Sequence, residues 1–567
     1  MPARKLHSPV WFETLNLAAA QSSISVDMLI LDAVSAEFFH TAAGTAFVDL
    51  LINGKRETWP IRSKRFRTWL RRRHYETTRT AASAAAINSA LDLLEAQAQF
   101  EGPERAVHVR LAEHEGHIYL DLADECWRAV EIGPDGWRVI GSPPVRFRRA
   151  AGMVPLPLPQ GGGSIEELAS FLNLPSRNDF VLVVAWLLAT LRAGSPYPVL
   201  AISGEQGSAK TVLSKLLKAL IDPNAAPVRA LAREERDLVI AANNSHVLAF
   251  DNLSSLPHVL SDAFCRLATG ASFGLRQLYT DADEVLFQAA RPILLNGIED
   301  VISRPDLADR ALFLTLPPIA DHRRHSERQL WRDFEVARPR ILGSLLDAAA
   351  HGLRKLPSLY LDQLPRMADF ALWATACETA FWPAGTFVRA YRANRKAALE
   401  DLIDADPVAA RVRQIMANRS TWSGSASDLV RAGADLAGPG LPRGATAWPK
   451  NPPALAGRLR RAQAFLRVLG IEISFHREGR AGTRVIRIHT RAENTVSSIR
   501  HADHDPRSSQ PSLGPARDES HRPEVTAADD AHAADANSFW GTRRVLTLAI
   551  WAFSRARLCQ FRPSSAR

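Results

Sequence analysis

A glycine-rich loop between an apolar strand and an amphipathic helix constrains the fold of this chain more than any other feature. Residues 198–203 are apolar, Ser203–Thr211 reads SGEQGSAKT, and residues 211–221 continue as an amphipathic helix. The backbone N–H groups of such a loop, at the N-terminus of a helix, surround a bound phosphate. Strand, loop and helix together predict a nucleotide site in a parallel α/β sheet rather than a chance glycine-rich turn.

Each polar position of the loop has a predicted role. Lys210 would neutralise the β- and γ-phosphates of ATP, and the Thr211 hydroxyl would ligate Mg²⁺. Ala209 stands where the usual pattern has a second glycine. We expect Gly207 to carry the positive φ and Ala209 to have an ordinary right-handed backbone, which alanine tolerates. The predicted nucleotide-binding residues are Gly204, Glu205, Gln206, Gly207, Ser208, Ala209, Lys210 and Thr211.

A second apolar strand ends in a carboxylate about forty residues further on. Residues 247–252 read VLAFDN, and Asp251 is predicted to hold Mg²⁺ together with Thr211. The next position usually carries the acid that accepts a proton from the attacking water, but here it is Asn252, whose amide cannot accept one. Either hydrolysis is slow or another acid takes this role; the candidates are Glu234, Glu235 and Asp237.

Two further residues complete the predicted catalytic set of Lys210, Asp251, Asn296 and Arg310. Asn296 ends an apolar strand, where it would sense the γ-phosphate, although Asn296-Gly297 is also a favourable turn by itself. Arg310 precedes the strand of residues 311–316 and would act as an arginine finger on a neighbouring subunit. Its alternative role is a surface ion pair with Asp309.

In this order and spacing, the four elements resemble those of AAA+ ATPases. Residues 264–279 (FCRLATGASFGLRQLY), then EVLF at 284–287 and Asn296, resemble the superfamily-3 helicase block of phage and plasmid primase-helicases. The resemblance covers residues from 165 to about 400, and such chains occur in bacterial mobile elements as ATP-binding proteins. This sequence departs from the pattern at Asn252, and at Ala271-Ser272, where Gly-Asp is common.

The resemblance implies an ATP- and Mg²⁺-dependent DNA helicase or translocase for mobile-element replication. It also implies a homo-oligomeric ring, a hexamer, with DNA in its channel and other replication proteins as partners. Arg276 and Tyr279 would project toward that DNA. One alternative is an ATP-gated DNA-binding switch that hydrolyses poorly because of Asn252, and another is a replication loading factor.

Two basic regions lie outside the nucleotide-binding elements. Residues 453–469 predict a helix with one apolar face, and two strands joined by a basic turn follow it. This outline is typical of a winged helix, in which Arg458, Arg461 and Arg480 would bind DNA, unless the domain docks a protein.

The second basic region, Arg62–Arg73, interleaves basic residues with Phe66 and Trp69. This pattern suits single-stranded nucleic acid, or a helix that buries its aromatic residues and leaves its arginines solvated. Asp121 and Asp124 lack the D-x-D spacing of a two-metal polymerase, so we do not expect primase activity.

With 567 residues, the chain is long enough for several domains. We predict an N-terminal α+β domain at 1–160, a P-loop ATPase core with a parallel sheet at 161–320, and a helical lid at 321–404. A winged-helix-like domain at 405–490 and a mostly disordered tail at 491–567 would follow.

Charge and composition bear on the partners and the compartment. A net charge of +10 favours a polyanionic partner. Four widely spaced cysteines predict neither a zinc site nor a disulfide framework. The longest apolar runs are shorter than the roughly 20 residues that cross a bilayer. We therefore expect a soluble, cytoplasmic protein without a membrane partner.

Overall fold

The computed structural model describes most of the chain between residues 36 and 490. The described residues are 36–194, 196–276, 284–298, 301–302, 304–320, 324, 326–435, 448–468, 470–478 and 483–490. The predicted disordered tail, 491–567, lies outside them.

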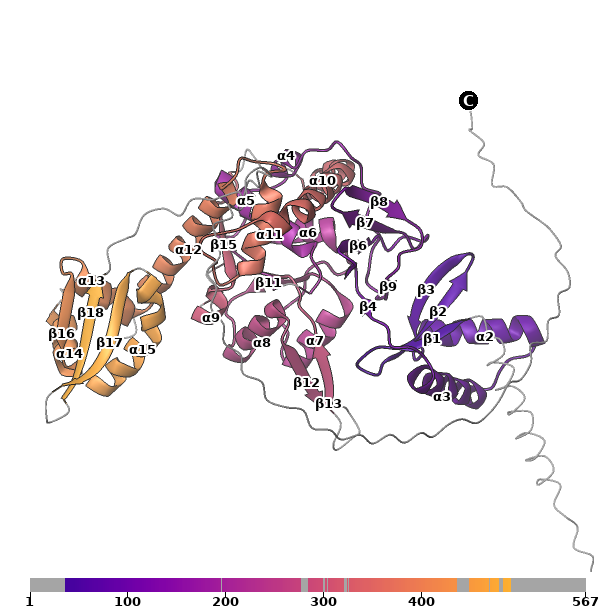
Figure 1. Cartoon of the computed structure of the whole chain (residues 1–567), viewed down its shortest axis with the longest axis horizontal. Coiled ribbons are helices and arrows are strands. Elements are labelled where there is room, and N and C mark those ends of the chain that lie inside the picture. Colours follow the sequence, from indigo (N-terminus) through magenta and orange to yellow (C-terminus); the bar gives the residue numbers. More distant parts are fainter. Residues whose placement is uncertain are drawn as a thin grey trace, which may run out of the picture. The chain divides into compact units, whose positions relative to one another are not determined.

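A four-stranded parallel sheet forms the centre of the fold (Figure 1). Its strands, in spatial order, are β11 (Leu248–Leu253), β14 (Ile293–Gly297), β10 (Val199–Gly204) and β15 (Ala311–Leu316). Most of their residues are buried apolar side chains, as expected for parallel strands covered on both faces. The predicted parallel α/β fold is confirmed. Because all four strands run the same way, their carboxyl ends share one edge, where ligands bind in such sheets.

Helices and one hairpin connect these strands. The helices are α6 (Lys210–Ile221), α7 (Glu235–Asn244), α8 (His258–Thr269) and α9 (Pro305–Ala308). The hairpin pairs β12 (Ser272–Arg276) with β13 (Glu284–Gln288) in antiparallel register between α8 and β14.

Helix α5 (Arg177–Thr190) contains the longest apolar run and is buried along its length from Phe180 to Thr190. A helix that is apolar on all sides belongs in a core, and α5 packs there against α6 and three further helices. These are α10 (Glu327–Lys355), α11 (Ala368–Glu378) and α12 (Thr386–Ala405); the short elements near them are α4 (Glu166–Ala169) and the 3₁₀ turn η2 (Leu356–Ser358). No helix among the described residues is both long and apolar enough to cross a membrane.

The glycine-rich segment Gln160–Gly163 packs directly on α10. The Gln160 amide donates to the Pro339 carbonyl at 2.9 Å. A Cβ atom on Gly343 would lie 1.8 Å from the Gln160 carbonyl oxygen, so only glycine permits this approach. The segment is therefore a packed backbone contact rather than a free linker.

A second, antiparallel sheet shares the core of the parallel one. It consists of β5 (Leu111–His114), β6 (His117–Asp121), β7 (Ala129–Gly133) and β8 (Gly136–Ile140), with the pair β4 (Val107–His108) and β9 (Arg146–Phe147) beside it. Its buried residues Leu111, Leu120 and Val130 belong to one hydrophobic cluster with α5, α6 and α10. The predicted boundary at residue 160 stays a prediction, but the hydrophobic core does not divide there.

Residues 36–105 build a separate hydrophobic cluster, to which Trp127 also belongs. A three-stranded meander is followed by two helices: β1 (Glu37–His40), β2 (Ala46–Ile52), β3 (Lys55–Pro60), α2 (Lys64–Thr78) and α3 (Ala84–Phe100). Helix α2 covers most of the basic region Arg62–Arg73 and buries Phe66, whereas the three strands were not expected. Asn53 and Gly54 form the tight β2–β3 turn with φ of 52° and 76°.

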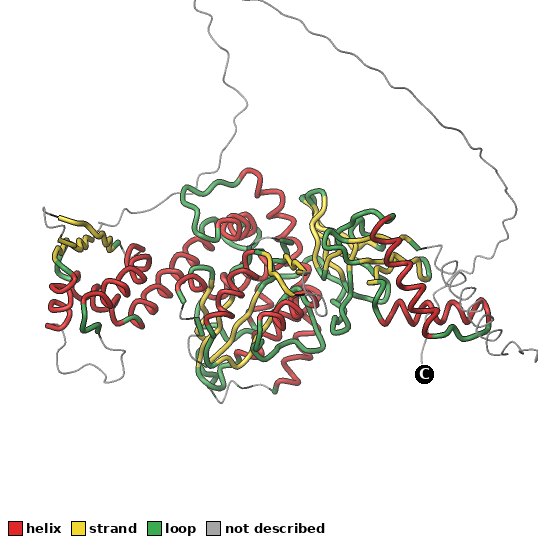
Figure 2. Tube along the Cα trace, turned by 90° about the horizontal axis from the view of Figure 1, so that it is seen from below, coloured by secondary structure: helices red, strands yellow, loops and turns green. Residues whose placement is uncertain are grey.

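Residues 407–490 combine three helices with a three-stranded antiparallel sheet (Figures 1 and 2). In chain order they are α13 (Pro407–Met416), β16 (Thr421–Gly424), α14 (Ala426–Asp435), α15 (Pro452–Val468), β17 (Ile471–Glu478) and β18 (Thr483–Thr490). The last helix and the two strands after it were expected, and β16 was not. Leu455, Leu459 and Leu466 of α15 face the shared core.

A buried charge network joins the antiparallel sheet to the far end of α6. The Asp222 carboxylate accepts from Arg110 Nε at 3.1 Å, Lys218 Nζ at 3.3 Å and the backbone N–H groups of His246 and Val247 at 2.9 and 3.0 Å. Burial alone would raise the pKa of Asp222, but the charges of Lys218 and Arg110 outweigh it and lower that pKa well below its usual range. Removing one partner from such a buried set leaves an unpaired charge, which costs about 3–5 kcal/mol.

The lowered pKa of His246 predicts how the stability of the fold depends on pH. Burial, and then the charge of Arg291, lowers the pKa of this histidine to about 4, while its Nε2 donates to the Thr190 carbonyl at 2.7 Å. Between pH 6.5 and 4 the unfolded chain binds a proton that the folded chain does not bind. Stability should therefore fall by about 3 kcal/mol as pH drops through this window.

Urea unfolding followed by tryptophan fluorescence at several pH values measures this effect. His246→Gln should flatten the slope between pH 6.5 and 4. Part of the slope should remain, because burial also lowers the pKa of His108 to about 4. Parallel pH profiles for wild type and His246→Gln would contradict the assignment.

Candidate nucleotide site

The loop Ser203–Thr211 lies at the carboxyl edge of the parallel sheet, between β10 and α6. Gly204 has φ +144°, and a Cβ atom there would lie 2.6 Å from the Leu316 carbonyl oxygen of β15. Gly207 has φ +84°, which confirms the expected positive φ at this position. Glu205, Gln206 and Gly207 are exposed at the tip of the loop.

The expected backbone conformation of Ala209 is wrong. Ala209 is the N-cap of α6 with φ +66° and ψ 28°, in the left-handed region. A Cβ atom in this region crowds the following carbonyl and costs roughly 1–2 kcal/mol, which explains why glycine is usual here. Alanine is thus tolerated at a cost in strain, and the helix begins without a side-chain cap on its first N–H groups.

Lys210 folds back into the loop. Its Nζ donates to the carbonyl oxygens of Gly204 at 2.7 Å and Glu205 at 2.8 Å. Partial burial lowers the pKa of the amine, and the nearby charge of Asp251 opposes that shift. The loop therefore holds an ammonium group among backbone carbonyls, where a phosphate would be a stronger partner.

Thr211 and Asp251 meet, as the sequence predicts. The Thr211 hydroxyl donates to Asp251 Oδ1 at 2.9 Å, although forty residues separate them in the chain. A hydroxyl and a carboxylate oxygen are hard ligands of the kind that Mg²⁺ takes in small number, completing its shell with water and phosphate oxygens. These two residues fit a Mg²⁺–nucleotide site. The described residues contain no cluster of three or more His, Cys, Asp or Glu that could hold a metal alone.

Asn252 lies in an irregularity of strand β11. The β11–β14 register shifts between Phe250 and Leu253, and Asn252 there has φ +57°. Asn enters the left-handed region several-fold more readily than most residues. Asn252 therefore suits its backbone better than a glutamate would, which gives a local reason for the amide at this position.

Asn296 holds this irregularity in place. Its Oδ1 accepts from the Asn252 backbone N–H at 2.9 Å, and its Nδ2 donates to Ser214 Oγ of α6 at 3.0 Å. Asn296 is 1% exposed, so both ends of its amide are engaged inside the protein. Its role as a γ-phosphate sensor stays a prediction.

A groove of about 380 Å³ opens beside Asp251 and Asn252. Residues 228–231 also line it. Arg229 extends the sheet past β11, since its N–H donates to Ala249 and its carbonyl accepts from the Asp251 N–H, both at 2.9 Å. The volume lies in the range of small-ligand sites.

Within the described residues, no hydrogen bond joins Asp251 to any of the three alternative acids. Glu235 is engaged with Arg266 at 2.5 Å. Glu234 is the N-cap of α7, and Asp237 lies in its first turn.

Arg310 is paired within its own subunit. Its Nη1 lies 2.7 Å from Asp306 Oδ1, and its side chain is 16% exposed. The alternative partner, Asp309, is instead paired with Arg366 and Arg395. Arg366 also reaches Asp306 at 3.0 Å, so Arg310 belongs to a network that joins α9 to α12 and to the segment just before α11. Its action on a neighbouring subunit stays a prediction.

Two residues near the loop were not predicted from the sequence. Asn173 Nδ2 donates to the carbonyls of Ser208 at 3.2 Å and Pro317 at 2.7 Å, which ties the loop to the end of β15. Arg324 Nη2 lies 3.5 Å from the position that a Cβ atom of Gly207 would take, so this guanidinium stands at the mouth of the loop. A lone asparagine gives no sequence signal, whereas the pair Arg323-Arg324 was visible.

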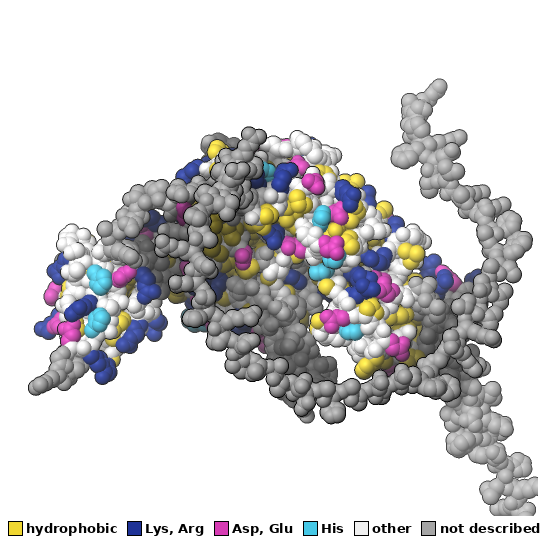
Figure 3. Space-filling model, in the orientation of Figure 1, with side chains coloured by type: hydrophobic (Ala, Val, Ile, Leu, Met, Phe, Trp, Pro, Cys, Tyr) yellow, Lys and Arg dark blue, Asp and Glu magenta, His cyan; other side chains and the backbone are white. Residues whose placement is uncertain are grey.

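The predicted DNA-binding residues are described only in part. Tyr279, Arg480 and the side chain of Arg276 lie outside the described residues. Arg458 is half-buried at the edge of the apolar face of α15, with Nη2 3.9 Å from Asp406. Arg461 is exposed, and so is Arg460, which stacks on Phe475 at 4.8 Å. Figure 3 shows Lys and Arg side chains on the visible face of residues 407–490, interspersed with acidic ones.

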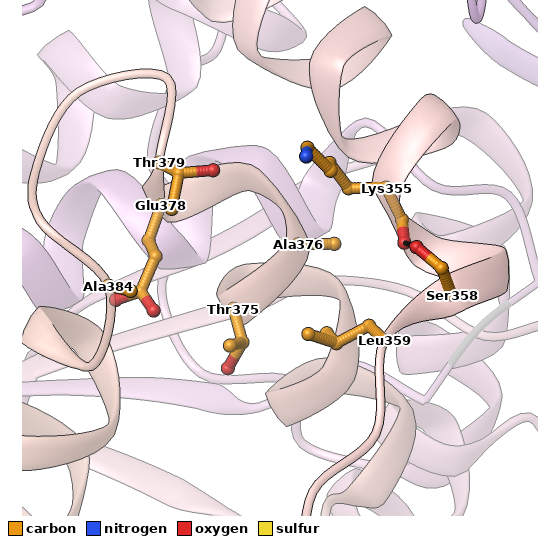
Figure 4. Close-up of a pocket in the computed structure, with 8 residues that line it drawn as sticks. All are labelled: Lys355, Ser358, Leu359, Thr375, Ala376, Glu378, Thr379 and Ala384. Atoms are coloured by element: carbon orange, nitrogen blue, oxygen red, sulfur yellow. Dashed lines mark hydrogen bonds between the residues drawn. The ribbon is translucent and has the colours of Figure 1, made fainter. Parts of the chain in front are cut away.

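A separate cavity lies between the end of α10 and α11 (Figure 4). It has about 20 Å³ for solvent, roughly the space of one water molecule. Glu378 lines it and accepts from the Gly385 and Phe387 N–H groups, both at 2.7 Å. This cavity is too small for a nucleotide.

Ala209 provides a direct test of the loop geometry. Ala209→Gly should leave stability unchanged or raise it by up to about 1 kcal/mol, because relief of strain offsets the greater freedom of glycine in the unfolded chain. Ala209→Val should lower stability clearly, since a β-branched residue is a genuine outlier at this φ. Thermal melts of the two variants measure this. A loss of about 1 kcal/mol on Ala209→Gly, as in an ordinary helix, would contradict the left-handed conformation.

Comparison with protein families gives two adjoining matches. The model described as actinomycete integrative conjugative element replication protein matches residues 165–405. The model of the C-terminal domain of the same RepA proteins matches residues 408–506. The two matches together span more than half of the chain. No curated protein matches it.

Two solved structures match this chain over most of their length, at low identity. The apo C-terminal region of NrS-1 is 12% identical, with a TM-score of 0.36, 81% of this chain covered and 98% of the other. The active helicase Cch of SCCmec type IV is 10% identical, with a TM-score of 0.39 and coverages of 80% and 92%. Both scores are too low to carry an argument about fold or activity.

Proposed function

Because this chain belongs to the family of actinomycete integrative conjugative element replication proteins, we propose that it is an ATP- and Mg²⁺-dependent DNA helicase or translocase. It would act in the replication of a mobile element. The observation that carries the proposal is the hydrogen bond from the Thr211 hydroxyl to Asp251 at 2.9 Å. Thr211 directly follows Lys210, whose ammonium group lies inside the loop.

The chain's own residues account for nucleotide binding. The uncapped N-terminus of α6 would offer its free N–H groups to the phosphates, and Lys210 would exchange its carbonyl partners for phosphate oxygens. Arg324, at the mouth of the loop, adds a second positive charge from the same subunit. Asn173 keeps the loop at the end of β15 while the phosphates enter. Mg²⁺, when bound, would stabilise the charge that develops during phosphoryl transfer.

The fold outside the loop supports an AAA+ assignment. β14 lies between β10 and β11, so Asn296 stands between the loop and Asp251. Helices α10–α12, which follow β15 in the chain, would form the lid. Arg366 and Arg395 pair with Asp309, which would couple movements of that lid to the segment that carries Arg310. A ring in which Arg310 reaches a neighbour's nucleotide belongs to this proposal.

The order of elements in residues 407–490 supports a winged helix. Helix, strand, two helices and two strands, with β18 between β16 and β17, form the outline expected for that domain. α15 would then be the recognition helix. Arg460 and Arg461 are its best candidates for DNA, because Arg458 faces Asp406.

ATP hydrolysis in the presence and absence of single- and double-stranded DNA tests the proposal. We expect DNA to stimulate hydrolysis by wild type, and Lys210→Ala to abolish nucleotide binding. Asn252→Asp should raise the rate about tenfold or more, because a carboxylate can accept the proton of the attacking water and Asp tolerates a left-handed backbone.

Asn252→Ala is the matched control, since it removes the amide without adding a base. Nucleotide binding without DNA-stimulated hydrolysis, in wild type and in Asn252→Asp, would contradict a motor and favour an ATP-gated DNA-binding switch. Absence of nucleotide binding by wild type would contradict both.

A further inference from the structure

Helix α2 carries a row of cationic and hydroxyl side chains on its outer face. Lys64, Thr68, Arg71 and Tyr75 follow one another at spacings of four, three and four residues, so they share one face, and Arg67 flanks them. We call these five residues the α2 stripe. The opposite face, with Phe66, Leu70 and His74, is buried. The fold of residues 36–105 therefore uses only the apolar face of this helix.

Neighbouring arginines are neutralised, but the three cations of the α2 stripe are not. Arg62 pairs with Asp92 and Glu95, Arg65 with Glu57, and Arg72 with Glu76. Arg65 also stacks on Trp59 at 4.5 Å. In the described part of the chain, no carboxylate lies within 4.0 Å of the cationic groups of Lys64, Arg67 or Arg71.

The charges of α2 oppose its dipole. The first turn carries Lys64, Arg65 and Arg67 and no acid, while the last turn carries Glu76 and no base. A helix is stabilised by the reverse arrangement, because its N-terminal end is already positive. Helix stability therefore does not account for these cations. Together with the helix end they concentrate positive potential along one exposed face.

We propose that the α2 stripe binds the phosphate backbone of single-stranded DNA. Lys64, Arg67 and Arg71 would contact phosphates, and the Thr68 hydroxyl would donate to one. Tyr75 is 53% exposed at the end of the stripe, roughly 16 Å along the helix from Lys64. An unpaired base can stack on its ring, whereas a paired base cannot, which favours a single strand over a duplex.

The α2 stripe shares no residue with the DNA-binding residues of the proposed function. The inference rests on the proposed function only in taking DNA as the partner. The α2 stripe lies outside residues 165–506, which the replication-protein models match. It would give the N-terminal part of the chain a role in holding the strand on which the motor acts.

Fluorescence anisotropy of the full chain with a labelled 20-nucleotide strand, and with the duplex of the same sequence, over a salt series tests the proposal. Lys64→Ala/Arg67→Ala/Arg71→Ala should weaken single-strand binding and reduce the slope of log affinity against log salt by about 2. Tyr75→Ala should weaken single-strand binding about tenfold with little change in slope. Tyr75→Phe should bind like wild type.

The matched control removes three exposed arginines from α10 and α12. Arg328→Ala/Arg354→Ala/Arg392→Ala changes the net charge equally and should keep the wild-type slope. The triple α2 variant should melt at the wild-type temperature or above it, because it removes cations from the N-terminal half of a helix.

Three results would overturn the proposal. The α2 and control variants could bind single strands equally, the α2 variant could lose duplex binding to the same extent as single-strand binding, or it could melt at a lower temperature. If wild type binds neither DNA, the DNA helicase proposal fails with this one. If wild type binds DNA and only the α2 variant shows no effect, this inference alone fails.

Discussion

The position of α6 depends on the buried Asp222 carboxylate at its C-terminal end. Asp222 binds Arg110, which directly precedes β5 of the antiparallel sheet, and the N–H groups of His246 and Val247, which directly precede β11. Helix and strand are thereby held together at one end. At the other end, about 18 Å along the twelve-residue helix, Thr211 meets Asp251. The buried cluster around Asp222, which is costly to break, thus fixes the position of α6 relative to β11. That position brings Thr211 and Asp251 together in the nucleotide site.

The backbone around the site changes the interpretation of its two unusual residues, Ala209 and Asn252. Ala209 was expected to be harmless, but its left-handed backbone makes it a source of strain. Asn252 was expected to be a simple loss of an acid, but it occupies a bulge where φ is positive, with its N–H held by Asn296. The missing acid is therefore coupled to a backbone feature. A change of side chain at 252 acts on both geometry and chemistry.

The central fold and the loop were predictable because each element carries a strong local signal. The four parallel strands are apolar runs, and a glycine-rich loop with Lys210 and Thr211 has few alternative uses. The β1–β3 meander was missed although Asn53-Gly54 is a good hairpin turn, since its strands alternate only weakly. Asn173, Arg324 and the Arg110–Asp222 pair join residues 35 to 150 positions apart, and no spacing rule reveals such contacts. The DNA contact of Arg458 stays a prediction, because one helical position decides whether an arginine faces solvent or Asp406.

The account depends most on Lys210, Thr211 and Asp251 forming one nucleotide site. Calorimetric titration of the full chain with a non-hydrolysable ATP analogue, with and without Mg²⁺, tests this most directly. We expect saturable binding to wild type that weakens at least tenfold without Mg²⁺, and loss of this Mg²⁺ dependence in Asp251→Asn. Binding that is equally tight with and without Mg²⁺, or no binding at all, would contradict the account.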